Sequence, residues 1–225
     1  MLIVAEAVRL DQIAMSGPIH IPDPREREVA VRYFKPFVEY FRGCRHVLDV
    51  ASGQGHFLEM LKEAGIGAQG VEIDSALCEL ARDKGLDVVQ GNFFEFLRSA
   101  QSGSFDGAAA SHIVEHHSPV QVEELLLLLH QALKPGSLLV VITPNIANIR
   151  RAVGDFWRDP THVRPYPVAA LTKLMRRTGW EVVKSDEYTD RPPSLLRSIV
   201  YGVRNALLGR YWSGDDLYVI ARRSA

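Results

Sequence analysis

The chain has 225 residues, of which 47% are hydrophobic and 24% are charged, and its formal net charge at pH 7 is −1. These proportions are ordinary for a soluble globular protein and by themselves indicate no function, while the near-neutral charge argues against a general nucleic-acid coat. The length predicts one long domain, because two domains would be cramped.

The cysteine content and the first residues bear on the compartment. Cys44 and Cys78 are too few and too scattered for a disulfide framework or a Cys-based zinc site, which fits a reducing compartment. The apolar start over residues 1–4 is soon interrupted by charged side chains, so it predicts neither a signal peptide nor a membrane span. We therefore expect a cytoplasmic protein.

The N-terminal part predicts an arm followed by a helix. Residues 1–24 contain glycine-proline and proline-aspartate pairs, which are typical of turns and loops. Between Arg25 and Arg42 apolar side chains recur at i, i+3, i+4 and i+7, which predicts an amphipathic helix with Pro36 as a site for a kink. We expect residues 1–44 to form an arm and a helix that covers the rest of the domain.

The most informative stretch is VLDVASGQGHF at residues 47–57. Its apolar run breaks into a turn of small residues and resumes as a helical pattern that ends before Gly65. This order predicts a strand, a glycine loop and a helix. Gly53 and Gly55 remove two Cβ atoms where a ligand can lie against backbone N–H groups at the start of a helix.

A second strand is predicted over residues 67–74, and it ends in carboxylates. Glu72 follows the glycine loop by about 20 residues, the spacing that dinucleotide-type sites require. Its carboxylate is placed to accept hydrogen bonds from both hydroxyls of a ribose. The loop and the acid together predict a nucleoside site at the carboxyl edge of a parallel sheet.

The remaining elements continue the alternation of strands and helices, which implies parallel strands. Turn residues and apolar periodicity set their limits. The expected elements are helices at 56–64 and 75–84, strands at 87–90 and 105–111, a helix from Pro119 that ends at 134–136, a strand at 138–143, a helix at 167–178, and strands at 180–184 and 216–221.

The motifs VLDVASGQGHF, GVEID, GNF, FDG and LKPGS, in this order, resemble the class I S-adenosylmethionine-dependent methyltransferases over residues 45–145. A dehydrogenase usually has a third glycine at the helix start, where this chain has His56-Phe57, so a dehydrogenase is disfavoured. The resemblance implies an α/β fold: a doubly wound, Rossmann-like seven-stranded sheet, mostly parallel, with a C-terminal antiparallel hairpin. It also implies S-adenosyl-L-methionine as the cofactor and residues 45–145 as its binding core.

The same resemblance implies which side chains bind the cofactor. Asn92 stands where the family usually has an aspartate that meets the adenine amino group, and its amide oxygen can accept the same hydrogen bond. The implied cofactor-binding residues are Asp49, Ala51, Gly53, Gly55, Glu72, Ile73, Asn92, Phe93 and Ser111.

The segment SHIVEHH, residues 111–117, directly follows the fourth strand, next to the expected position of the transferred methyl group. In a helical turn His112, Glu115 and His116 would share one face and could bind one cation. The letters also match an inverted zinc-protease motif, which we set aside because the segment follows a sheet strand.

Metal-dependent O-methyltransferases of the ubiquinone pathway and of small-RNA ends are similar here, since they carry E-x-x-E-H at this site. The RNA enzymes add a histidine downstream, and His162 lies in a comparable place. One alternative is therefore a divalent metal ion bound by His112, Glu115, His116 and His162, where so many imidazoles favour Zn²⁺, Fe²⁺, Mn²⁺ or Ni²⁺ over Mg²⁺. The other alternative is a turn that lines the methionine end of the cofactor without a metal.

A second motif, FWRDPTHVRPY at residues 156–166, resembles the F-x-x-D-P-T-H-x-R-P signature of methyltransferases of bacterial surface-polysaccharide assembly, including sugar O-methyltransferases. The resemblance implies aromatic stacking on a sugar and an Asp159 that orients His162. We expect residues 146–179 to face the acceptor, with His116, His162 and Asp159 in catalytic roles, because imidazole is a suitable general base near neutral pH.

The charge distribution favours an anionic acceptor. Between Arg150 and Arg177 there are seven basic residues and only two aspartates. Such a local excess fits a phosphorylated or nucleotide-linked sugar or a lipid-phosphate-linked glycan.

Residues 188–214 form an insertion between the last two strands that is longer than a hairpin turn needs. An apolar stripe between residues 196 and 207 predicts an amphipathic helix that packs on the domain or at a homodimer interface. The flanking arginines leave a second option, in which residues 193–210 contact a membrane surface.

We therefore expect a single-domain S-adenosylmethionine-dependent O-methyltransferase that acts on a hydroxyl of a sugar or phosphoglycan, with or without a metal ion. One alternative keeps the reaction but has a small aromatic or quinone-like hydroxyl, or an RNA 3′ end, as the acceptor. An alternative of another class is a non-catalytic cofactor-binding partner protein, against which the near-intact glycine loop argues.

Overall fold

The computed structural model describes residues 24–188 and 214–224. The arm predicted for residues 1–24 lies outside the described residues except for Pro24. The amphipathic stripe predicted between residues 196 and 207 also lies outside them, together with its suggested membrane or dimer contact.

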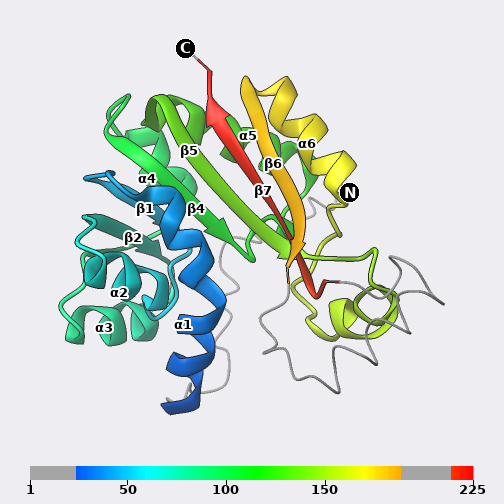
Figure 1. Cartoon of the computed structure of the whole chain (residues 1–225), viewed down its shortest axis with the longest axis horizontal. Coiled ribbons are helices and arrows are strands. Elements are labelled where there is room, and N and C mark those ends of the chain that lie inside the picture. The colour runs from blue at the N-terminus through cyan, green and yellow to red at the C-terminus, as the bar shows by residue number, and fades with distance from the viewer. Residues whose placement is uncertain (1–23, 189–213, 225) are drawn as a thin grey trace, which may run out of the picture.

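Within these residues seven strands form one sheet in the order β3-β2-β1-β4-β5-β7-β6 (Figure 1). The strands are β1 Val47–Val50, β2 Ala68–Glu72, β3 Val88–Gln90, β4 Phe105–Ser111, β5 Leu133–Pro144, β6 Trp180–Tyr188 and β7 Asp216–Arg223. The first five strands are parallel, and β7 runs antiparallel to both β5 and β6. The predicted fold class is confirmed, including the C-terminal antiparallel hairpin.

Helices cover both faces of the sheet. They are α1 Pro24–Val38, α2 His56–Glu63, α3 Ser75–Asp83, α4 Phe93–Ser99, α5 Pro119–Ala132 and α6 Val168–Arg177, with the short helical turns η2 Glu39–Phe41, η3 Val114–His116, η4 Arg151–Asp155 and η5 Phe156–Arg158. None of the helices described here combines the length and the apolar character that crossing a bilayer requires.

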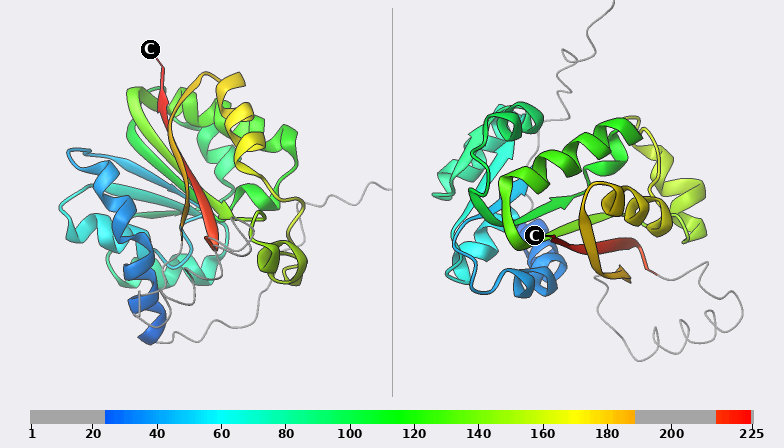
Figure 2. Two further views of the ribbon diagram at one scale, coloured as in Figure 1. Left: turned by 45° about the vertical axis from the view of Figure 1, so that its right-hand side comes forward. Right: turned by 90° about the horizontal axis from the view of Figure 1, so that it is seen from above.

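Strand β1 shows why two layers of helices form. All four of its residues are buried, because successive side chains of a strand point to opposite faces. Leu48 and Val50 belong to the core formed with α4, α5 and α6, while Val47 belongs to the core formed with α1 and α2. Figure 2 shows the two layers on either side of the sheet. The polar side chains that follow the parallel strands therefore gather at one edge of the sheet.

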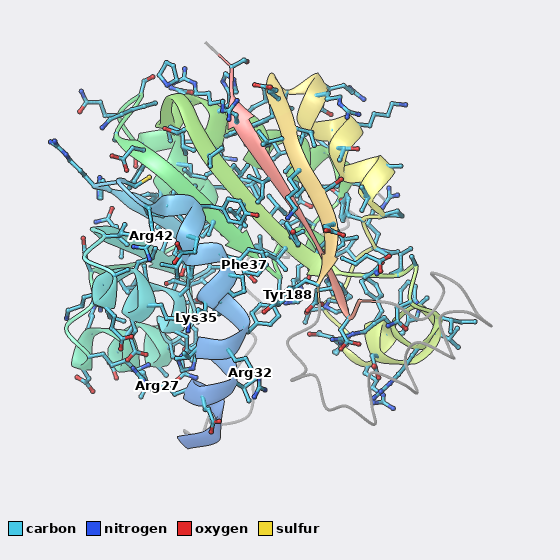
Figure 3. All side chains as sticks on the ribbon, in the orientation of Figure 1. Arg27, Arg32, Lys35, Phe37, Arg42 and Tyr188 are labelled. Carbon is cyan, nitrogen blue, oxygen red and sulfur yellow. The ribbon has the colours of Figure 1, made fainter. Side chains whose placement is uncertain are left out.

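The covering helix predicted from Arg25 to Arg42 is α1 followed by η2, and Pro36 lies within the last turn of α1. The apolar side of α1 packs on the sheet, where Phe37 is 2% exposed. The ring centroids of Phe37 and Tyr188 are 5.1 Å apart, and Figure 3 shows both side chains between the helix and the strands. Helix α1 is thus fixed to the last hairpin and extends past the carboxyl edge of the sheet.

Helix α4 is not among the elements expected from the sequence, which placed none between the third and fourth strands. The side chain of Asn92 accepts the backbone N–H of Phe94 at 2.8 Å and so begins the helix. Phe94 and Leu97 then bury the inner face of this short helix. A helix of two turns is too short to show a clear apolar period, and this is why the sequence missed it.

Strand β5 is longer than the expected 138–143. The residues Lys134-Pro135-Gly136, which were expected to end the preceding helix, belong to the strand instead. Leu133 already pairs with Phe105, and a register shift separates this pair from the regular pairing that starts at Leu138. The irregular backbone at proline and glycine is accommodated by this shift.

Candidate active site

The loop from Ala51 to Gly55 joins β1 to α2 at the carboxyl edge of the sheet. Ala51, Gly53 and Gly55 have φ angles of 56°, 54° and 81°, in the left-handed region that disfavours residues with a Cβ. At Gly55 a Cβ would meet the side chain of Leu86 at 2.5 Å, so this glycine serves close packing against a neighbouring segment. At Gly53 a Cβ would meet nothing within 4 Å, which leaves this backbone open to a ligand.

Glu72 ends β2 and holds the glycine loop. Its Oε2 accepts the backbone N–H of Gly53 at 2.8 Å, and its Oε1 accepts those of Ile73 and Asp74 at 2.8 and 3.0 Å. Each carboxylate oxygen has two lone pairs, so Oε2 keeps one for a ligand hydroxyl. The sequence predicted the ligand-binding role, but the anchoring of the loop is visible only in the structure.

The side chains around this loop suit a nucleoside. Ile73, beside Glu72, is apolar and yet 66% exposed, as expected for a residue that packs on a ligand. Asn92 is exposed, and one lone pair of its amide oxygen is used to cap α4, which leaves the other lone pair and the NH₂ group for a base. The hydroxyl of Ser111, at the end of β4, is buried and has no hydrogen-bond partner among the described residues.

Asp49 lies in β1 and is 5% exposed. Burial, followed by the charge of Glu72, raises the pKa of its carboxyl to about 8. Asp49 is therefore mostly neutral at pH 7 in the protein. A carboxyl that resists ionisation in the core lowers stability as the pH rises, and its presence needs a functional reason.

Replacing Asp49 by asparagine is expected to stabilise the protein at alkaline pH. The carboxyl ionises near pH 3.9 in the unfolded chain but near pH 8 in the folded one. The free energy of unfolding therefore falls as the pH rises from about 4 to about 8, and it is constant above pH 8 as far as this group is concerned. We expect Asp49→Asn to raise the free energy of unfolding by on the order of a few kcal/mol near pH 8 and by little near pH 4. Urea unfolding of both proteins across this range measures the difference. A difference that does not change with pH would contradict the raised pKa.

Beyond β4 the chain turns sharply at His112, whose φ is 53°. Residues 114–116 then form η3, a 3-10 turn in place of the expected α-helical turn. Glu115 is fully buried. Its carboxylate accepts a hydrogen bond from Nδ1 of His112, at 3.2 Å, and another from the hydroxyl of Thr143, at 2.9 Å. Burial alone would raise the pKa of the Glu115 carboxyl, but the contacts with His112 and Thr143 outweigh burial and lower it.

The other ring nitrogen of His112 faces helix α1. Nε2 of His112 lies 2.9 Å from the hydroxyl of Tyr33, which also donates to Asp216 Oδ2 at 3.0 Å. Burial would lower the pKa of His112, but the carboxylates of Glu115 and Asp216 outweigh burial and raise the pKa of this imidazole. Burial also raises the pKa of the Tyr33 hydroxyl and of the Asp216 carboxyl. The contact between Tyr33 and Asp216 could not be predicted from the sequence, because the two residues are 183 positions apart and no local spacing links them.

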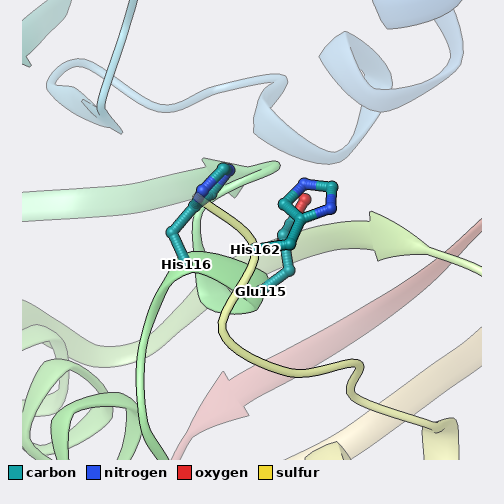
Figure 4. A group of neighbouring side chains, drawn as sticks. All are labelled: Glu115, His116 and His162. Atoms are coloured by element: carbon teal, nitrogen blue, oxygen red, sulfur yellow. The ribbon is translucent and has the colours of Figure 1, made fainter. Parts of the chain in front are cut away.

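The structure brings Glu115, His116 and His162 together, as Figure 4 shows. One ligand atom from each of the three lies within 4.8 Å of the others, and the rings of the two histidines are 4.8 Å apart. The backbone N–H groups of Val163 and Arg164 donate to the carbonyl of Glu115 at 2.8 and 3.2 Å, which ties the downstream loop to η3. His112, the fourth expected ligand, does not join this group.

Asp159 does not orient His162 through a hydrogen bond. Its Oδ2 lies 3.9 Å from Nε2 of His162, whereas Nδ1 of His162 lies 2.6 Å from the carbonyl oxygen of Phe156. Asp159 Oδ1 instead accepts the hydroxyl of Thr161 at 2.6 Å, and Thr161 Oγ1 lies 2.7 Å from Nδ1 of His116. Asp159 is thus linked to His116 through Thr161, a residue that the sequence analysis did not single out.

The basic residues counted along the sequence do not form one patch. Arg150 and Arg158 both pair with Asp155, at 3.4 and 3.2 Å. Arg177 pairs with Glu123 at 3.0 Å, at the end of α6. Figure 1 shows this end of α6 at the opposite end of the sheet from η4 and η5. The local charge at the site is therefore smaller than the sequence suggested.

Comparison with known proteins gives a consistent result. Residues 24–185 match the family model described as "Methyltransferase domain". Among curated proteins, no sequence matches this chain.

Several solved structures are similar over most of the chain. A SAM-dependent methyltransferase from Archaeoglobus fulgidus has 29% identity and a TM-score of 0.75, over 88% of this chain and 94% of that one. A chain of the complex between the Haloferax volcanii Trm112 methyltransferase activator and a methyltransferase has 17% identity and a TM-score of 0.71, over 90% and 95%. A SAM-dependent methyltransferase from Mesorhizobium loti has 20% identity and a TM-score of 0.62, over 85% and 98%. The last two similarities support the fold alone.

Proposed function

Because the chain belongs to the methyltransferase domain family and is an S-adenosylmethionine-dependent methyltransferase, we propose that it methylates a hydroxyl group of a sugar or phosphorylated glycan. The observation that carries this proposal is the pair of imidazoles, His116 and His162, beyond the carboxyl end of β4. A hydroxyl acceptor must lose a proton during methyl transfer, and an imidazole can take it near neutral pH.

The residues of the loop and of the strand ends would hold the cofactor. Glu72 would accept a ribose hydroxyl through its remaining lone pair, and Ile73 would pack on the adenine beside Asn92 and Phe93. When bound, S-adenosylmethionine supplies a methyl group that is already activated by its sulfonium, so the protein mainly has to align the acceptor oxygen with it. The neutral Asp49 would face the positive charges of the methionine part, which favour its ionised form.

The glycan acceptor is supported by the segment that follows β5. Trp157 in η5 is 60% exposed, and such an aromatic side chain can stack on the apolar face of a sugar. This segment carries the F-x-x-D-P-T-H-x-R-P motif, and its resemblance to the signature of sugar O-methyltransferases is part of the proposal.

Acceptor profiling with radiolabelled cofactor tests the proposal. We expect label to be transferred to phosphorylated, nucleotide-linked or lipid-phosphate-linked sugars as a methyl ether. Transfer only to catechol-like or quinone-like hydroxyls, or only to RNA 3′ ends, would replace the glycan by one of these acceptors. Tight cofactor binding without transfer to any acceptor would favour a non-catalytic partner protein.

The alternative is that the same side chains bind a divalent metal ion, but their arrangement matches such a site only in part. Ligands bonded to one ion at about 2.1 Å lie about 3 to 4 Å apart, whereas the atoms of Glu115, His116 and His162 are separated by up to 4.8 Å. Each oxygen of Glu115 already uses one of its two lone pairs, in hydrogen bonds from His112 and Thr143. The geometry therefore favours a metal-free role for His116.

We expect methyl transfer to survive treatment with strong chelators, because His116 Nε2 accepts a proton in place of binding an ion. Activity is measured before and after dialysis against a chelator, beside elemental analysis of protein purified without one. Loss of activity that returns with added Zn²⁺, Mn²⁺, Fe²⁺ or Ni²⁺ would contradict this expectation and identify the cluster as a metal site.

A further inference from the structure

The turn Asp159-Pro160-Thr161 lies against His116 and connects a carboxylate to this imidazole. Asp159 Oδ1 accepts two hydrogen bonds from Thr161, one from its backbone N–H at 2.8 Å and one from its hydroxyl at 2.6 Å. The oxygen of the same hydroxyl lies 2.7 Å from His116 Nδ1. Two short contacts of the Thr161 hydroxyl thus connect Asp159 to His116.

The direction of each hydrogen bond follows from the number of hydrogens available. The bond from the Thr161 hydroxyl lowers the pKa of the Asp159 carboxyl, so Asp159 is ionised and can only accept. The one hydroxyl hydrogen of Thr161 therefore goes to Asp159. The Thr161 oxygen then has only lone pairs for His116, so Nδ1 of His116 carries the hydrogen and Nε2 keeps its lone pair.

We propose that Thr161 is a positioning residue that, together with Asp159, fixes the tautomer of His116 so that Nε2 is the base in methyl transfer. This inference rests on the proposed O-methylation. It also distinguishes the two histidines. His162 Nδ1 donates to the backbone carbonyl of Phe156, and Nε2 of His162 lies 3.9 Å from Asp159 Oδ2, beyond hydrogen-bond distance. Hydrogen bonds through Thr161 therefore connect the Asp159 carboxylate to His116 and not to His162.

These groups account for every bond, proton and charge in the methyl transfer. The acceptor oxygen forms a bond to the methyl carbon while the carbon–sulfur bond breaks, and the electron pair of that bond stays on sulfur. The acceptor proton moves to Nε2 of His116. The positive charge that leaves the sulfonium then appears on the imidazolium, where the chain through Thr161 to Asp159 stabilises it.

The test replaces Thr161 by valine, which has nearly the same shape but no hydroxyl. The backbone bond from residue 161 to Asp159 remains, so the turn should be kept. We expect Thr161→Val to lower kcat by about 10- to 100-fold with little change in KM, because His116 is no longer held in the productive form. Thr161→Ser restores the hydroxyl and should retain activity within about threefold of the original. Thr172→Val, in α6, is the control, since within the described part of the chain the hydroxyl of Thr172 bonds only to the carbonyl of Ala169.

A spectroscopic measurement separates this inference from the identity of the acceptor. In protein labelled with nitrogen-15 histidine, the chemical shifts of His116 should show the tautomer with hydrogen on Nδ1, and Thr161→Val should shift the population toward hydrogen on Nε2. This measurement needs no acceptor, so it remains valid if no glycan is methylated. An unchanged tautomer in the valine variant, or an unchanged kcat, would overturn the role of Thr161.

Discussion

Replacing Glu72 by alanine is expected to weaken the binding of S-adenosylmethionine by about one to two orders of magnitude, since the change removes charge-assisted hydrogen bonds to the ribose. The effect has a second source. Glu72 also accepts the backbone N–H groups of Gly53, Ile73 and Asp74, so its loss leaves three amides without their acceptor and loosens the loop. Isothermal titration calorimetry with cofactor and with its demethylated product measures the affinity.

The two roles of Glu72 can be separated by thermal unfolding without ligand. Loss of the loop anchor lowers the Tm of the free protein, whereas loss of a ribose contact changes only the stabilisation that the cofactor adds. Glu79→Ala is a matched control, because Glu79 is an exposed glutamate on the neighbouring helix α3. Unchanged cofactor affinity in Glu72→Ala would remove Glu72 from the binding site.

Replacing His116 by alanine is expected to lower kcat by about 10²- to 10⁴-fold, the usual contribution of general acid–base catalysis. Affinity for the cofactor should change little, because the residues expected to bind the cofactor lie on the glycine loop and the ends of the first strands. Initial rates with the best acceptor, combined with calorimetry on the demethylated cofactor, separate the two quantities.

His162→Ala serves as the comparison for this prediction. Its ring lies beside that of His116 but is held by the carbonyl of Phe156, so its loss should cost less in kcat than the loss of His116. An equal or larger loss in His162→Ala would assign the base to His162. A small loss in both variants would show that the imidazole pair does not take the acceptor proton.

Much of the fold could be predicted because it depends on short-range patterns. Strands such as β1 and β5 contain runs of apolar residues next to a helical period, and glycines such as Gly65 and Gly85 mark the helix ends with positive φ. The glycine loop and Glu72 were visible for the same reason, since their spacing is fixed by one strand–helix–strand unit. Helix α4 and the first residues of β5 were missed, because two helical turns and a strand containing proline give no clear period.

The candidate site was predicted only in part, because its geometry depends on contacts between distant segments. His116 and His162 were placed together by a motif resemblance, and the structure does hold them side by side. The expected face shared by His112 and His116 does not form, since His112 takes a positive φ and the following turn is a 3-10 turn. Tyr33 lies in no motif, and Thr161 lies in the F-x-x-D-P-T-H-x-R-P motif without any local spacing that indicates its contact with His116. They matter through hydrogen bonds to residues 79 and 45 positions away.

The positive charge between Arg150 and Arg177 is spread over the fold. The basic residues between Arg150 and Arg177 lie close in sequence, but the chain passes from the carboxyl edge of the sheet to the opposite end between them. Several of these arginines are neutralised by Asp155 or Glu123. The anionic character of the acceptor therefore remains part of the proposal and depends on acceptor profiling.

The most direct test of the proposed site is a crystal structure of the protein with the demethylated cofactor. We expect a ribose at Glu72, an adenine against Ile73, and a sulfur atom that faces His116 Nε2 with room for one hydroxyl oxygen between them. A complex in which the sulfur points away from His116, or in which the nucleoside lies outside the loop of residues 51–55, would contradict it.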